Sequence, residues 1–396
     1  MGCQTCATSS SVEAPIADVR PLPGIRYADI AHLTNLVAPP YDVIPDSAVA
    51  RYEALSPHNV IRLIRPGADY ARAAGTFEAW LADGTLREDL PAMYLHEVDL
   101  GEGRTRRDLI AALRLEPYDK GIVLPHERTH RGPKEDRLAL MRATHASLEP
   151  LWFVYDGKGT DLRTLLDQAV NRPADSTFTD SDGLQQRLWI APGGAWTQSV
   201  SAAMERLPVL IADGHHRYET TLAYAEEAGG PPDASSRFTL ALLTDLDDPG
   251  LQVLPTHRVL KAGIAVTGGE DMPSLESTLE ALRGRVAAGT YRDHRFQLLP
   301  LEGEVALVQL HDQVIDNMLG KRSPEDFLLY TRDAAEAVRW VDEGTGVGAF
   351  FLDGPDLRQV LKLAQEGKTL PQKSTYFYPK PPSGMVFHRL DPGRRL

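Results

Sequence analysis

The segment from residue 208 to 217 has the residue types of a phosphate-binding site. An apolar run, PVLIA, leads directly into Asp213, Gly214, His215, His216 and Arg217, and a helix-like segment follows at once. A turn between a strand and a helix directs backbone N–H groups and the positive end of the helix dipole to one point. Glycine permits the turn, and arginine binds phosphate oxygens through two N–H groups. We predict that Gly214, His215, His216 and Arg217 bind phosphate and that Asp213 is a catalytic group or metal ligand; the alternative is a structural turn.

A second group of ionisable side chains lies in LPHERT (124–129), which GPKEDR (132–137) follows. A carboxylate beside histidines has the chemistry that general-base catalysis requires. Glu127 is therefore the predicted base, and His126 is its predicted catalytic neighbour. The alternative is a solvated charged loop, which is a common place for such a run of charges.

The segment LPQKSTYFYPK (370–380) offers a cation, hydroxyl groups and backbone N–H groups close together. We expect Lys373, Ser374 and Thr375 to bind the substrate, although the sequence contains no Walker-type GxxxxGK[ST] loop. A polar connector between elements is the alternative. In APPYDV (38–43), a rigid proline turn presents Asp42, which is a further candidate for substrate binding or simply part of a turn.

The elements that must position these residues alternate between strand and helix patterns, which is typical of an α/β protein. Two strands, at 93–100 and 106–116, are expected to pair across a GEGR turn, and a helix is expected at 68–84. A β-branched run at 60–65, VIRLIR, is typical of a strand. Later expected strands cover 151–156, 187–192, 208–214 and 237–246, and helices lie between them.

The composition narrows the class of protein. The chain has 396 residues and a formal charge of −13, from 42 Lys and Arg against 55 Asp and Glu. An acidic protein is a poor candidate for binding the phosphate backbone of DNA or RNA, so nucleic acid is not an expected partner. The only cysteines, Cys3 and Cys6, exclude a disulfide framework. No signal peptide and no apolar run of about 20 residues is visible, so we expect a cytoplasmic protein that does not bind membranes.

The motifs APPYDV, LPHERT, ADGHHRYE, LPTHRVL and LPQKSTYFYPK, in this order, resemble a widespread family of uncharacterised conserved prokaryotic proteins. A more distant resemblance is to the ParB/sulfiredoxin-like fold, whose phosphate-binding corner is similar to DGHHR. Within that group, the free serine kinases carry a Pro-His-Glu motif, the DGHHR corner and a Pro-Lys-Thr-Thr-type loop. The matching positions here are Pro125–Glu127, Asp213–Arg217 and Lys373–Thr375.

This resemblance implies a function for each motif. Glu127 would activate the hydroxyl group of the substrate, and residues 213–217 would hold the phosphates of ATP or ADP together with Mg²⁺ at Asp213. Lys373, Ser374 and Thr375 would hold the substrate or the transferred phosphoryl group. The implied activity is that of a small-molecule kinase acting on free L-serine or a similar hydroxyl compound.

We therefore expect an α/β fold with a ParB/sulfiredoxin-like nucleotide-binding core and additional α/β layers. The expected regions are a flexible tail (1–15), an N-terminal α/β region (16–115), the core (116–262) and a C-terminal α/β region (263–396) that contributes a site loop. Two alternatives remain open for the function. One is a nucleotide or phosphoester hydrolase, in which Glu127 or His126 activates water, and the other is a non-catalytic ParB-like nucleotide-binding module.

Overall fold

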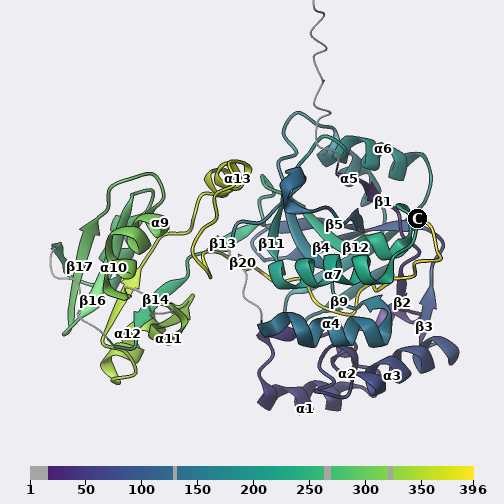
Figure 1. The fold of residues 1–396 in the computed structure, drawn as a ribbon, viewed down its shortest axis with the longest axis horizontal. Helices are drawn as coiled ribbons and strands as arrows, with labels where there is room; N and C mark the ends of the chain where they lie inside the picture. The colour runs from purple at the N-terminus through teal and green to yellow at the C-terminus, as the bar shows by residue number, and fades with distance from the viewer. Residues whose placement is uncertain (1–16, 128–131, 263–268, 320–323) are drawn as a thin grey trace, which may run out of the picture.

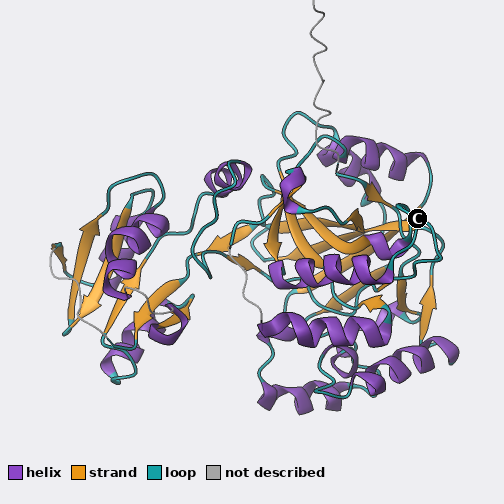
Figure 2. Cartoon of the chain, viewed as in Figure 1, coloured by secondary structure: helices purple, strands orange, loops and turns teal. Residues whose placement is uncertain are grey.

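The chain folds into a larger and a smaller part, each built on its own β-sheet (Figure 1). The computed structural model describes residues 17–127, 132–262, 269–319 and 324–396. The expected tail at 1–15, with Cys3 and Cys6, lies outside the described residues. Figure 2 shows helices on both faces of each sheet, and the predicted fold class, α/β, is confirmed. In the described ranges, none of the helices is both long enough and apolar enough to pass through a membrane.

The larger part contains a mixed nine-stranded sheet. Its parallel pairs are β6 (Val123–Leu124) with β11 (Val209–Asp213) and β8 (Leu151–Tyr155) with β12 (Phe238–Asp245). Strands from residues 16–115 and from 116–262 share it, so the sheet continues across the boundary that we expected at residue 115. The antiparallel pairing of β4 with β5 is the one that the sequence predicts. Across the sheet the strands are β6 (Val123–Leu124), β11 (Val209–Asp213), β8 (Leu151–Tyr155), β12 (Phe238–Asp245), β5 (Thr105–Arg114), β4 (Ala92–Asp99), β10 (Gln185–Pro192) and β9 (Ser176–Thr179), with β1 (Val19–Arg20) paired to β5.

Alternate residues of these strands enter two separate cores, because successive side chains of a strand point to opposite faces. Leu210 lies in one core, and its neighbours Val209 and Ile211 lie in the other. The first core includes residues of α1 (Asp46–Leu55), α2 (Ile61–Ile64), α3 (Tyr70–Ala82) and α4 (Gly132–Thr144). The second includes residues of α5 (Leu162–Ala169), α6 (Ala195–Met204) and α7 (His215–Ala228).

The β-branched run at 60–65 forms the helix α2 and not a strand, so that expectation was wrong. A short apolar run does not distinguish a buried strand from a buried helix. Here the side chain of Asn59 favours the start of a helix, because its Oδ1 accepts a hydrogen bond from the Ile61 N–H at 2.9 Å. Such a bond satisfies an N–H group that the first turn of a helix leaves unpaired.

The smaller part is a six-stranded sheet that also has a core on each face. Its strands, in order, are β15 (Glu270–Met272), β17 (Arg295–Pro300), β16 (Ala287–Arg292), β19 (Gly348–Phe351), β14 (His257–Leu260) and β18 (Leu328–Thr331). The helical segments around it are α8 (Leu275–Leu282), α9 (Ala306–Leu310), the π-helical turn η5 (His311–Ile315), α10 (Asp316–Leu319), α11 (Pro324–Phe327) and α12 (Ala334–Asp342).

After the smaller part, the chain returns to the larger one through α13 (Leu357–Gln365). The N–H of Leu370 donates to the carbonyl of His126 at 2.7 Å, which places the 370–380 segment beside the predicted base. Three two-stranded pairs complete the described structure: β13 (Gln252–Leu254) with β20 (Tyr376–Tyr378), β2 (Ile25–Tyr27) with β3 (Leu86–Glu88), and β7 (Ala146–Ser147) with β21 (His388–Arg389). Short 3₁₀ turns are η1 (Ile30–Asn35), η2 (Tyr41–Val43), η3 (Tyr118–Lys120) and η4 (Ser235–Arg237).

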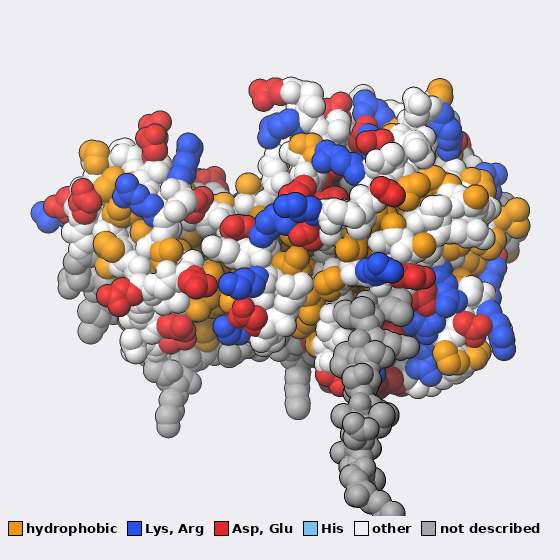
Figure 3. All heavy atoms as spheres, turned by 90° about the horizontal axis from the view of Figure 1, so that it is seen from above, with side chains coloured by type: hydrophobic (Ala, Val, Ile, Leu, Met, Phe, Trp, Pro, Cys, Tyr) orange, Lys and Arg blue, Asp and Glu red, His pale blue; other side chains and the backbone are white. Residues whose placement is uncertain are grey.

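Side chains of both charge signs lie interspersed over the face seen in Figure 3. Such mixing is typical of a solvated surface.

Candidate functional site

A cavity of about 560 Å³ lies between residues of the larger part, the smaller part and the C-terminal segment. Nine of the eleven predicted site residues line it: Asp42, Glu127, Asp213, Gly214, His215, His216, Arg217, Lys373 and Thr375. The other two, His126 and Ser374, are buried beside this wall, with exposed fractions of 1% and 2%. The structure thus brings together residues that are up to 333 positions apart, from Asp42 to Thr375.

The 213–217 corner has the strand–turn–helix geometry that the sequence predicts. Strand β11 ends at Asp213 and helix α7 starts at His215. Gly214 joins them with φ +99°, a left-handed conformation that side chains disfavour. A Cβ atom at Gly214 would lie 2.9 Å from Leu151 Cδ2 and 3.2 Å from Arg217 Nε. Glycine is therefore required there both by the turn and by the close approach of the arginine.

Two cations hold the Asp213 carboxylate. Oδ1 is ion-paired with Lys380 Nζ, and Oδ2 accepts a hydrogen bond from Arg217 Nη2 at 2.8 Å. Burial by itself would raise the pKa of Asp213, but the charges of Lys380 and Arg217 outweigh burial and lower that pKa. Asp213 is consequently ionised at neutral pH, and the ion pair fixes Lys380 at the cavity wall.

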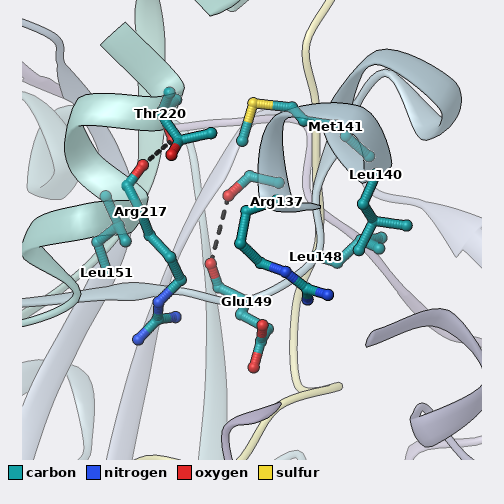
Figure 4. A pocket seen from close by; sticks show the side chains of 11 residues that line it. Arg137, Leu140, Met141, Leu148, Glu149, Leu151, Arg217 and Thr220 are labelled. Atoms are coloured by element: carbon teal, nitrogen blue, oxygen red, sulfur yellow. Dashed lines mark hydrogen bonds between the residues drawn. The ribbon is translucent and has the colours of Figure 1, made fainter. Parts of the chain in front are cut away.

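Arg217 reaches the cavity from the first turn of α7. Its Nη1 donates to the carbonyl of Pro150 at 3.1 Å. In Figure 4 the Glu149 carboxylate lies between the guanidinium groups of Arg217 and Arg137, around a second, small cavity of about 40 Å³. Burial would lower the pKa of Arg217, but the charges of Glu149, Asp213 and Asp42 raise it. The guanidinium is thus a permanent, well-fixed cation at the wall of the large cavity.

Glu127 joins the two other predicted motifs. Its Oε1 accepts hydrogen bonds from the N–H groups of Ser374 at 2.8 Å and Thr375 at 3.3 Å. Its Oε2 accepts from the N–H of Lys373 at 3.1 Å. The Ser374 hydroxyl donates to the carbonyl of Pro371, so this side chain belongs to the loop itself. The carboxylate therefore orders the 373–375 loop and also faces the cavity.

Burial would raise the pKa of Glu127, but hydrogen bonding to His126 and to the loop N–H groups lowers that pKa to about 2. Its side chain is 15% exposed, and Oε1 lies 3.6 Å from His126 Nε2. Burial lowers the pKa of His215 to about 3. His215 Nε2 accepts a hydrogen bond from the backbone N–H of His126 at 3.3 Å, which fits a neutral ring that carries its proton on Nδ1.

Asp42 stands in the 3₁₀ turn η2, directly after the two prolines. The turn is fixed by the N–H of Tyr41, which donates to Glu149 Oε1 at 2.9 Å. The guanidinium of Arg137 lies 4.1 Å from the centre of the Tyr41 ring. The sequence offered a structural turn and a binding carboxylate as alternatives for the APPYDV motif. The motif is in fact a rigid turn that also brings the Asp42 carboxylate to the cavity.

Several cavity residues were missed by the sequence reasoning. Lys380 lies inside the LPQKSTYFYPK motif, where its position after Tyr378-Pro379 gave no indication of a partner. Thr331, Arg332 and Glu336 come from the smaller part, from the end of β18 to the first turn of α12. No local pattern in that segment distinguishes it from an ordinary strand–helix junction.

The residues at Asp213 do not fit a resident Mg²⁺ ion in this arrangement. Both carboxylate oxygens of Asp213 are already taken by cations. Throughout the described ranges, no group of three or more His, Cys, Asp or Glu side chains is placed to share a metal ion. The charge that could balance a bound phosphate comes instead from Lys380, Arg217 and Lys373.

Comparisons with known proteins give a family and several structural relatives. Free serine kinase in complex with AMP is 15% identical, with a TM-score of 0.38 over 68% of this chain and 86% of that chain. A conserved hypothetical protein from Pyrococcus furiosus is 15% identical, with a TM-score of 0.37 over 70% of this chain and 93% of that one. C-terminally truncated SbnI from Staphylococcus aureus is 10% identical, with a TM-score of 0.38 over 71% and 87%.

The sequence comparisons are more specific about the family. No curated protein matches the chain. A family model described as a protein of unknown function, DUF1015, matches residues 19–345, which is most of the chain. This confirms the resemblance to an uncharacterised family that the ordered motifs predicted. The chain belongs to the DUF1015 family.

Proposed function

We propose that this protein is a phosphotransferase that moves a phosphoryl group from ATP or ADP to a small hydroxyl metabolite, with free L-serine as the first candidate. The observation that carries the proposal is the single cavity that holds the 213–217 corner, the Glu127 carboxylate and the 373–375 loop. Phosphoryl transfer is catalysed mainly by positioning and by electrostatic stabilisation, so it requires fixed cations and a base within reach of one hydroxyl group.

The donor side of the cavity is the start of α7. The first turn of α7, with its positive dipole end, and the Arg217 guanidinium line the place where a phosphate chain would lie. Lys380 adds a second cation there, fixed by Asp213. The Asp213 carboxylate thus acts as a positioning residue for both cations, and we assign no step to a metal ion.

The acceptor side is formed by Glu127, Lys373 and Thr375. Glu127 is ionised at neutral pH, so it can accept the proton that the substrate hydroxyl loses. A carboxylate with this low pKa is a weak base. It therefore receives the proton late, when the hydroxyl oxygen has begun to bond to phosphorus and has become acidic. Lys373 and Thr375 would hold the acceptor beside it.

One alternative is favoured by a specific observation. Three N–H groups of the 373–375 loop donate hydrogen bonds to Glu127, and a carboxylate with a purely structural role would accept such bonds. If that is its only task, the protein is a nucleotide-binding module without catalysis. A hydrolase, in which Glu127 activates water, would use the same cavity. His126, the other residue expected for that role, is buried beside the cavity wall.

One experiment separates these functions. The purified full chain is incubated with ATP or ADP, Mg²⁺ and L-serine or a pool of small hydroxyl metabolites, and products are followed by mass spectrometry. A phosphorylated acceptor supports the kinase. Phosphate release without an acceptor indicates the hydrolase, and nucleotide binding without turnover indicates the module. If neither nucleotide binds, the proposal is wrong.

A further inference from the structure

A third cavity, of about 430 Å³, adjoins the large cavity of about 560 Å³. Four residues line both cavities: Val43, Arg332, Tyr376 and Lys380. The two cavities therefore meet at a place that carries two cations, one from the smaller part of the molecule and one from the C-terminal segment.

The ring of Tyr376 brings these two cations together. Arg332 Cζ lies 4.9 Å from the centre of that ring, and Lys380 Nζ lies 5.5 Å from it. The Arg332 guanidinium also lies 5.4 Å from the centre of the Tyr378 ring. Cations that share one aromatic ring repel each other unless a negative charge stands near them.

Among the residues that the structure describes, one of the two cations has a carboxylate partner and the other has none. Lys380 is paired with Asp213. Arg332 is exposed, and in the described parts of the chain its side chain has no ion pair or hydrogen bond with a carboxylate. The nearby Glu336 is not such a partner, because it accepts from Thr331 Oγ1 at 2.5 Å and pairs with Arg339 at 3.3 Å. Asp180 and Asp182 line the same cavity of about 430 Å³. Among the described residues, however, no carboxylate forms an ion pair with Arg332.

The backbone at Arg332 is fixed toward the cavity. Asp333 caps α12 and accepts from the Ala335 N–H at 2.9 Å. The preceding strand β18 pairs with β14, and Arg258 of β14 donates to the carbonyl of Lys373 at 3.1 Å. The smaller part is therefore tied to the 373–375 loop, and this contact holds Arg332 at the junction.

We propose that Arg332 and Lys380 form an anion site for a diphosphate group, so that the smaller part supplies a phosphate-binding residue to the cavity. That the diphosphate belongs to a nucleotide rests on the proposed function. Two adjacent phosphoryl groups carry negative charge that would balance the positive charges of Arg332 and Lys380. A guanidinium can bind phosphoryl oxygens through two N–H groups.

The test is calorimetric titration of the full chain with ADP, adenosine and inorganic pyrophosphate. The variants are Arg332→Ala and Arg332→Lys, with Arg292→Ala as the matched control. Arg292 is an exposed arginine at the end of β16 whose ion-pair partner is the neighbouring Asp293.

We expect Arg332→Ala to weaken ADP and pyrophosphate binding about 10- to 100-fold, as loss of a charged hydrogen bond does. Arg332→Lys should recover part of this loss, and Arg292→Ala should bind as the unaltered protein does.

The outcomes distinguish a failure of the proposed diphosphate site from a failure of the proposed kinase function. Equal ADP binding by Arg332→Ala and the unaltered protein overturns the diphosphate site and leaves the proposed function standing. Equal losses of ADP and adenosine also overturn the site, because the effect would not depend on phosphate. Pyrophosphate binding that requires Arg332, without any nucleotide binding, supports the site and overturns the function. If the unaltered protein binds neither ADP nor pyrophosphate, both are wrong. Thermal unfolding of each variant verifies that the fold is intact.

Discussion

Glu127 Oε1 accepts a hydrogen bond from the backbone N–H of Ser374 at 2.8 Å, although 247 positions separate the two residues in the chain. The neighbouring N–H groups of Lys373 and Thr375 donate to the same carboxylate. Multiple N–H donors stabilise the ionised form of a carboxylate and also fix the backbone that provides them. The charge of Glu127 therefore serves the 373–375 loop and the cavity together, and its removal should affect both.

Glu127→Gln should lower turnover about 10²- to 10⁴-fold, the usual contribution of a placed base. The amide nitrogen would also face the N–H of Lys373 or those of Ser374 and Thr375, so the loop loses at least one acceptor. ADP affinity should change little, because the donor side of the cavity is the start of α7. Turnover by mass spectrometry, calorimetric ADP affinity and amide exchange at residues 373–375 measure the three effects separately.

Thr375→Val is the comparison variant for this prediction, and it is assayed at saturating acceptor because Thr375 also lies on the acceptor side of the cavity. It removes the Thr375 hydroxyl, which lies 2.8 Å from His126 Nε2 and 3.4 Å from Glu127 Oε1, and it keeps the carboxylate. If both variants lose turnover to the same extent at saturating acceptor, the order of the loop and not proton transfer limits the reaction. Turnover of Glu127→Gln within a factor of about three of the unaltered protein excludes Glu127 as the base.

Lys380→Met should weaken ADP binding about 10- to 100-fold and raise the pKa of Asp213. The reason is that Lys380 is one of the two cations that keep this buried carboxylate ionised. Lys380→Arg should retain most of the affinity. The measurement is ADP affinity between pH 5 and 8, with Lys368→Met as the control, since Lys368 is an exposed lysine paired with Glu366. Equal affinity of the two methionine variants would show that Lys380 does not face the phosphates.

The parts of the site that are local in sequence could be predicted. The 213–217 corner depends on a strand, a glycine and a helix that follow one another within a few residues, and local rules describe that arrangement. The order of the motifs also led us to expect Lys373, Ser374 and Thr375 beside the 213–217 corner, and Lys373 and Thr375 line the same cavity as that corner. Such inferences succeed because the residues concerned are either adjacent or carried by recognisable loops.

The interactions that depend on tertiary structure could not be predicted. Arg332 reaches the cavity through the pairing of β18 with β14, which no nearby residue encodes. Lys380 becomes relevant only through its ion pair with Asp213, 167 positions away. Ser374 looked like a substrate ligand by residue type, but its hydroxyl turns back to Pro371. Residue type indicates what a side chain can bind, whereas its partner is decided by packing.

Gly214→Ala should destabilise the fold by about 1–3 kcal/mol and weaken ADP binding. The new Cβ would stand in a left-handed conformation and 2.9 Å from Leu151 Cδ2, and it would press on Arg217.

Gly229→Ala, at the other end of α7, is the matched control. Gly229 has φ +68°, and a Cβ there would meet nothing within 4 Å. Urea unfolding and ADP titration should show a smaller stability loss for Gly229→Ala and no loss of affinity. Equal effects of the two substitutions would mean that backbone strain alone, and not the space beside Arg217, requires Gly214.

Stability should fall as the pH decreases from about 6.5 to about 4, in part because of His388. Burial lowers the pKa of His388 from 6.5 to about 4. Its Nε2 bonds to the carbonyl of Ser235 at 3.0 Å, and its buried Nδ1 has no hydrogen-bond partner among the described residues. Below pH 6.5 the unfolded chain therefore binds a proton that the folded protein does not bind, and the free energy of unfolding decreases. The loss for one such group approaches about 1.4 kcal/mol per pH unit inside this window.

His388→Gln can keep the bond to Ser235 and does not titrate, so its free energy of unfolding should decrease less steeply with falling pH. Urea unfolding at pH 7.5, 6 and 5 measures the difference, and the pH 7.5 value serves as the internal control because the imidazole is neutral there. Parallel pH profiles for the two proteins would mean that His388 titrates alike in the folded and unfolded states, contrary to its burial.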